Sequence, residues 1–159
     1  MPRSASIDRE RVRALYDDYV ALLDEGDFDS WLELFVEESV YRIVAAENFD
    51  RGLPLATVRC DSRRMLADRI FTIRSTQTFA PRRLRHFVSG IRIGASTASA
   101  RSVRASFLVI ESLDDEPSRV HVAGRYVDVV TESEGCLKFL EKVAVYDSPI
   151  IPVSLVYPV

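Results

Sequence analysis

The spacing of apolar residues changes halfway along the chain, and this change constrains the fold more than any other feature. Up to about residue 75, apolar residues recur every three or four positions, the period of an amphipathic helix. From about residue 86 they alternate with polar residues, the period of a strand with one buried face. Helices followed by a run of strands predict an α+β domain.

Capping residues and breakers divide the first half. Gly26 suits the end of a helix, and Asp27 suits the start of the next one. The predicted order is a helix over Ile7–Glu25, a short helix with Phe28, Trp31, Leu34 and Phe35, a strand over Ser39–Ala45, a loop over Glu47–Pro54, a helix over Asp61–Ile73 and a loop over Ser75–Arg85.

The second half is predicted to be a meander of four strands. Short polar joints at Leu113–Ser118 and Glu132–Gly135 connect neighbouring antiparallel strands. A long curved antiparallel sheet of this kind wraps around N-terminal helices as a cone, and we expect one domain over residues 1–159. The predicted strands are His86–Ile93, Ser99–Glu111, Arg119–Thr131 and Cys136–Tyr146.

Charge is distributed unevenly along the chain. The segment Arg51–Arg104 holds twelve arginines and two acidic residues, whereas the rest of the chain has a net charge of −13. Two interpretations stay open: the fold pairs the two sets internally, or the arginines form a basic face for an acidic partner surface or an anion. The chain is acidic overall and has no recognised nucleic-acid-binding motif, so we expect no nucleic-acid partner.

The cysteines and histidines do not form a metal-ligand pattern. A Rieske cluster needs two of each, but the nearest pair, His121 and Cys136, is fifteen residues apart. A mononuclear iron site needs two histidines and a carboxylate on one face, and His86 and His121 fall on different predicted strands. Glycine-rich phosphate loops and a serine nucleophile elbow are also missing. We therefore expect no metal, cofactor or catalytic residue in this chain.

A cone can nevertheless enclose a pocket in which a Tyr, Asp or His acts as an acid or base. The candidate pocket residues are Tyr41, Asp68, His86 and Tyr126. Each also has a structural interpretation, which we favour: core aromatics, a charge on a helix surface, and a hydrogen-bonded histidine at a strand end.

Several features predict a cytoplasmic protein without membrane association. The two cysteines, Cys60 and Cys136, are too few for a disulfide framework. The opening MPRSASIDRERVR lacks the apolar run of a signal peptide. The longest uncharged stretch, Ser148–Val159, is too short to span a bilayer and contains three prolines.

Four segments, in this order, resemble the β (small) subunits of aromatic-ring-hydroxylating dioxygenases. The resemblance extends over nearly the whole chain, from about Glu10 to Leu155. They are LLDEGDFDSWLELFVEESVYRI, AENFDRGLPLATVRCDSRRMLADRIFTIRS, RHFVSGIRI and DSPIIPVSL.

The resemblance implies a ketosteroid-isomerase-like, cystatin-like cone. It also implies a partner α subunit that carries a Rieske [2Fe–2S] cluster and a mononuclear Fe(II), usually in an α3β3 hexamer with β–β contacts. Such an assembly adds both atoms of dioxygen to an aromatic ring. The β subunit of the family holds no catalytic residue and is mostly structural.

The arginine-rich segment is the expected contact with the α subunit or a second β subunit. The apolar, proline-broken tail is expected to lie extended against its own domain or against a neighbouring subunit. The candidate interface residues are Arg63, Arg64, Arg82, Arg83, Ile151, Leu155 and Tyr157. Two alternatives stay open: a stand-alone isomerase or dehydratase with a cone pocket, and a small-molecule-binding protein.

Overall fold

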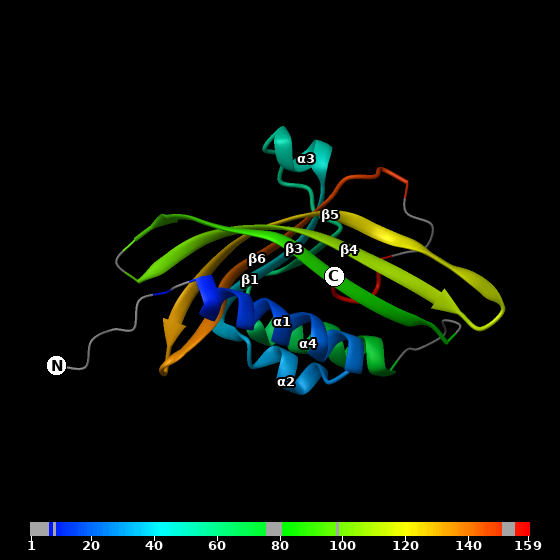
Figure 1. Ribbon diagram of the computed structural model, residues 1–159, viewed down its shortest axis with the longest axis horizontal. Coiled ribbons are helices and arrows are strands. Elements are labelled where there is room, and N and C mark those ends of the chain that lie inside the picture. Colours follow the sequence, from blue (N-terminus) through cyan, green and yellow to red (C-terminus); the bar gives the residue numbers. More distant parts are fainter. Residues whose placement is uncertain (1–6, 8, 76–80, 98, 151–154) are drawn as a thin grey trace.

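Four helices and six strands make up the computed structural model, which describes residues 7, 9–75, 81–97, 99–150 and 155–159. Figure 1 shows a long, curved sheet whose concave face covers α1, α2 and α4, while α3 lies on the opposite side. The helices are α1 Arg9–Glu25, α2 Phe28–Leu32, α3 Ala46–Asp50 and α4 Arg63–Ser75. The strands are β1 Phe35–Ala45, β2 Val58–Cys60, β3 Arg83–Ser96, β4 Ala100–Leu113, β5 Glu116–Ser133 and β6 Cys136–Tyr146.

The sheet order is β2-β1-β6-β5-β4-β3. The predicted antiparallel meander of β3 to β6 is confirmed, since each strand pairs with the next. The first and last strands then pair in parallel, with Ile43 opposite Ala144. This parallel pair closes the sheet around the helices, and β3 is left as one edge strand.

The predicted extent of the second helix was wrong. The helix α2 ends at Leu32, and Phe35 begins a strand four residues before the predicted start at Ser39. Trp31 and Phe35 are both fully buried. Their spacing of four fits one face of a helix, but a turn after α2 brings Phe35 to the same core as the first residue of β1.

Other predicted segments also differ from the structure. The expected loop over Glu47–Pro54 contains α3, which ends before Gly52 at a φ of 64°. The strand β2 was missed because three residues are too few to establish a period. The strand β3 starts at Arg83 rather than His86, inside the predicted loop.

One continuous core joins the helices to the concave face of the sheet. The apolar stripe of α1 is buried there, including Val12, Leu15 and Leu23. The predicted alternation in β4 is confirmed, because Val103 and Phe107 are buried while Arg104 and Ser106 between them are exposed. Among the described helices, none is both long and apolar enough to cross a membrane.

Candidate functional site

A buried charge pair lies at the centre of the cone. Lys142 on β6 and Asp128 on β5 are both almost completely inaccessible to solvent. The Nζ atom of Lys142 lies 2.8 Å from Oδ2 of Asp128, which also accepts a hydrogen bond from the hydroxyl of Tyr16. The backbone N–H of Val143 donates to Oδ1 of Asp128 at 3.0 Å. Every oxygen of this carboxylate therefore has a donor, as a buried charge requires.

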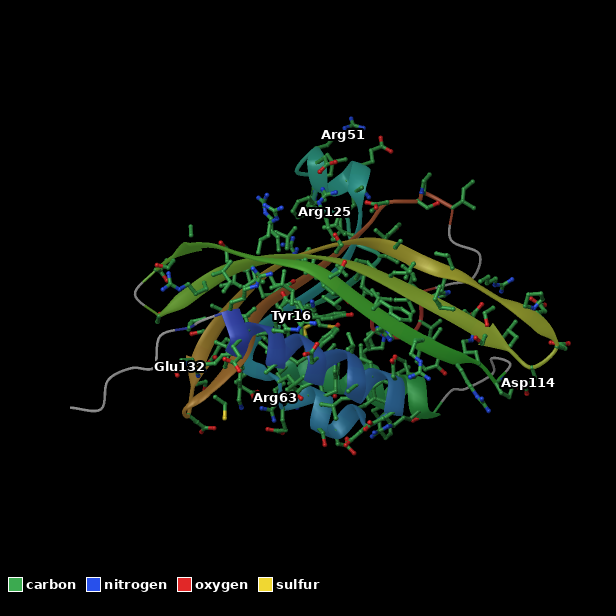
Figure 2. The ribbon with its side chains drawn as sticks, viewed as in Figure 1. Tyr16, Arg51, Arg63, Asp114, Arg125 and Glu132 are labelled. Carbon is green, nitrogen blue, oxygen red and sulfur yellow. The ribbon has the colours of Figure 1, made fainter. Side chains whose placement is uncertain are left out.

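Aromatic rings surround the ammonium group of Lys142. Its Nζ atom lies 3.1 Å from the ring centroid of Tyr126, 4.6 Å from that of Tyr19 and 4.8 Å from that of Tyr16. Figure 2 places Tyr16 between α1 and the sheet. Burial lowers the pKa of Lys142 to about 8, although the charge of Asp128 opposes this shift. Burial likewise raises the pKa of Asp128. We call Lys142, Asp128, Tyr16 and Tyr126 the interior cluster.

The tail residues Leu155–Val159 fill the space beside the interior cluster. The hydroxyls of Tyr19 and Tyr41 both donate to the backbone oxygen of Val159, at 2.6 and 3.2 Å. The Val159 N–H donates to the Tyr41 hydroxyl at 3.0 Å, and Nε2 of His86 lies 3.3 Å from the Pro158 oxygen. Side chains from α1, β1 and β3 thus bind the tail by its backbone.

Three of the four candidate pocket residues meet in this interior. Tyr41 and His86 contact the tail, and Tyr126 belongs to the interior cluster. The hydroxyl of Tyr126 has no hydrogen-bond partner among the described residues. Asp68 is not brought to them, because it lies exposed on α4.

Sequence reasoning missed Lys142 and Asp128. Buried residues alternate around Asp128 on β5, as Tyr126, Asp128 and Val130 show, whereas Lys142 begins a run of five buried residues on β6. A charged residue in the inward register of a strand was therefore an available signal. The alternation could not identify Lys142 as the partner of Asp128, because strand register is decided by tertiary pairing.

A second buried charge cluster lies around Glu111 of β4. This carboxylate is 1% exposed and accepts hydrogen bonds from Arg82 at 2.8 Å and from Arg119 at 2.9 and 3.0 Å. Nδ1 of His121 lies 3.7 Å from Glu111, too far for a hydrogen bond. Burial lowers the pKa of His121. The two guanidinium groups, which cannot lose their protons, make this a structural cluster rather than an acid–base pair.

The candidate interface residues fall into three groups. Arg63 pairs with Glu33 at 2.7 Å, Arg82 pairs with Glu111, and Leu155 is buried in the core of its own chain. Arg64 and Arg83 are exposed and form no ion pair with any described residue, while Tyr157 is half-buried. Ile151 lies outside the described residues.

The donor atoms of this chain do not fit an iron centre or an iron–sulfur cluster. Cys60 is buried on β2, whereas Cys136 is exposed at the start of β6. Within the described ranges, no group of three or more His, Cys, Asp and Glu residues could hold a metal ion.

Comparisons with known proteins agree with this fold. The family model described as "Ring hydroxylating beta subunit" matches residues 19–152. The chain is 31% identical over 145 residues to the anthranilate 1,2-dioxygenase small subunit of Burkholderia cepacia, covering 91% of this chain and 90% of that protein.

Two solved structures extend the comparison. A protein described as the β subunit of an aromatic-ring-hydroxylating dioxygenase from Novosphingobium aromaticivorans DSM 12444 has a TM-score of 0.85, at 30% identity over 95% of this chain and 96% of that one. A Nostoc punctiforme protein with a cystatin-like fold has a TM-score of 0.66 at 14% identity, over 93% and 96% of the two chains, and so shares the fold alone. The predicted α+β, cystatin-like cone is thus confirmed, and the chain belongs to the family of ring-hydroxylating β subunits, the small subunits of aromatic-ring-hydroxylating dioxygenases.

Proposed function

We propose that this chain, as a single domain, is a non-catalytic subunit that acts in the cytoplasm and supports a separate α subunit. That α subunit would carry the Rieske [2Fe–2S] cluster and the mononuclear Fe(II). The observation that carries the proposal is the closed interior of the cone. Lys142 and Asp128 are buried and paired with each other. Tyr41 and His86 contact the backbone of the tail. A substrate-converting site inside the cone would need an open interior into which polar groups converge.

Assembly with the α subunit is the remaining part of the proposal. We infer an α3β3 hexamer with β–β contacts. Support comes from guanidinium groups that the fold leaves without an ion pair among the described residues, including those of Arg64 and Arg83. A guanidinium group presents planar donors that match a carboxylate on a partner surface. The relative from Burkholderia cepacia is itself described as a small subunit.

The first experiment tests the absence of catalysis in this chain. The purified protein is incubated anaerobically with Fe(II), desalted, and assayed for bound iron and for oxygenation of benzoate and anthranilate with a reductant. We expect neither stoichiometric iron nor product. Iron held tightly by the chain alone, or turnover of either acid, would contradict the proposal.

The second experiment tests assembly. The chain is co-expressed with the product of a neighbouring gene whose sequence contains Cys-x-His and Cys-x-x-His ligands, with an affinity tag on that large chain only. We expect both chains to co-purify, with the mass of an α3β3 hexamer by native mass spectrometry. A tagged large chain that is fully active and fully assembled without this chain would contradict the proposed supporting role.

A further inference from the structure

Two features that the sequence suggested separately, the arginine-rich segment and the tail, meet at one cavity. This cavity has a volume of about 450 Å³ and lies where the end of α1, the start of α2, the end of α4 and the start of β3 converge. Figure 1 shows these ends of α4 and β3 on the same side of the molecule. Its lining includes Arg74, Arg82, Arg83 and Arg85, the acidic residues Asp24 and Glu25, and the aromatic rings of Phe28 and Tyr157. We call it the arginine pocket.

Two of the four arginines are already engaged within the fold. Arg74 pairs with Asp29 at 3.1 Å, and Arg82 pairs with the buried Glu111 at 2.8 Å. Their guanidinium groups are held in place by these bonds. Each of these charges is balanced by its carboxylate, so the two guanidinium groups add hydrogen-bond donors to the wall of the pocket rather than unpaired positive charge.

The other two arginines, Arg83 and Arg85, do not form a close ion pair of this kind. Arg83 is exposed, and its side chain has no ion pair or hydrogen bond to any described residue. Arg85 is 71% exposed, and its nearest acidic partner is Asp24 at 4.0 Å. Asp24 is itself bound to His86, through both the backbone N–H at 3.0 Å and Nδ1 at 2.7 Å. One oxygen of Asp24 is thus engaged by His86, and Glu25, the other acidic residue of the lining, forms no ion pair with any described residue.

The strand geometry brings Arg83 and Arg85 together. Arg83 and Arg85 are two residues apart in β3, so their side chains leave the strand on the same face, roughly 6–7 Å apart. Both side chains are exposed. Phe28 and Tyr157 add apolar surface to the lining of the same pocket.

We propose that the arginine pocket is a carboxylate-binding site, in which Arg83 and Arg85 hold the two carboxylate oxygens. Guanidinium groups bind carboxylates through paired, charge-assisted hydrogen bonds. The apolar wall of Phe28 and Tyr157 suits the body that carries the carboxylate, and the volume suits a compact acid. A free aromatic acid and an acidic side chain of a neighbouring subunit present this same chemistry, and two arms of one experiment separate them.

The first arm uses the isolated chain, and so does not depend on the proposed function. Benzoate is titrated into the wild type, R83Q, R83E and R92E, followed by calorimetry and by NMR shifts. Benzamide, the neutral isostere, is the control ligand. The R92E control removes an exposed arginine from the same strand, outside the pocket. A free acid as the ligand predicts saturable benzoate binding, no benzamide binding, and about tenfold or greater weakening in R83Q but not in R92E.

The second arm rests on the proposed function and measures association with the tagged α subunit at low and high salt. An acidic side chain as the ligand predicts that R83E weakens association about tenfold or more, most strongly at low salt, while R92E does not. R83Q keeps the test interpretable if the charge reversal lowers the melting temperature. If the wild type fails to bind the α subunit, the proposed function fails and the first arm alone decides the site. The carboxylate site is overturned if R83E and R92E behave alike in both arms.

Discussion

At the scale of single residues, the centre of the cone depends on a charge pair in an apolar core. Removing two charges from water is costly, and this cost is offset only when each charge keeps good partners. Lys142 has Asp128 and the faces of three tyrosine rings, and Asp128 has three hydrogen-bond donors. Each member of the pair therefore needs the other to be tolerated in the core.

Removing only the lysine should be far more damaging than removing both charges. We expect K142M to lower the free energy of unfolding by about 3–5 kcal/mol, because Asp128 is left as an uncompensated buried charge. The double variant D128N/K142M should recover much of that loss. Urea denaturation of the wild type, both single variants and the double variant measures the coupling. Additive effects of the two substitutions would rule out a coupled pair.

The buried His121 predicts a dependence of stability on pH. Its pKa is lowered in the folded state, so below about pH 6.5 the unfolded chain binds a proton that the folded chain does not. The free energy of unfolding should therefore fall as the pH is lowered from 7 to 5.5. In H121Q this fall should be smaller, since that proton no longer binds. Equal slopes for both proteins, from urea denaturation at several pH values, would exclude the histidine as the cause.

At the scale of elements, β5 and β6 pack unusually closely at one point. Gly124 lies opposite Tyr146, and a Cβ atom added to Gly124 would lie 2.0 Å from the backbone oxygen of Val145. Only a residue without a side chain allows this approach. The glycine therefore helps to set how β5 and β6 lie against each other beside the core.

We expect G124A to destabilise the protein by about 3 kcal/mol, because the backbone of one strand must shift. G94A is the matched control. Gly94 is also in a strand, but its added Cβ would meet the Oγ atom of Ser102, which can rotate away. That control should cost less than about 1 kcal/mol. Thermal and urea unfolding distinguish the two, and equal losses would show that backbone contact at Gly124 is not the cause.

The periods of the sequence predicted most elements, and two of the exceptions are strand residues that are placed by long-range pairing. Alternation correctly indicated the inner face of β4, since it reports local exposure. It failed at Phe35 and at β2, where long-range pairing with β6 and β1 decides the strand. Among site residues, the inward positions of Tyr41 and Tyr126 followed from strand period, but the exposure of Asp68 followed from how α4 packs.

At the scale of the whole molecule, the tail holds distant parts of the chain together. Tyr19 of α1, Tyr41 of β1 and His86 of β3 all bind the backbone of residues 158 and 159. The tail thus closes the cone that the parallel pairing of β1 and β6 shapes. The contribution of the tail contacts to the free energy of unfolding can be separated from that of the aromatic core by comparing two buried tyrosines.

We expect Y41F to lower the free energy of unfolding by about 1–3 kcal/mol, because its hydroxyl both donates to and accepts from Val159. The control Y126F removes a buried hydroxyl that has no partner among the described residues, so it should be neutral or slightly stabilising. Denaturation midpoints compare the two directly. If Y126F is as damaging as Y41F, loss of the tail contacts does not explain the effect.

Patterns in the sequence were enough to predict the helices-then-strands order, the alternation in β4 and, through ordered segments, the family. These are properties of neighbouring residues, which one chain segment carries alone. Only the tertiary structure decided that β1 pairs with β6, that Lys142 meets Asp128, and that the tail fills the interior. The physical reason is that a local period reports which face is apolar, whereas contacts between distant segments depend on register and closure.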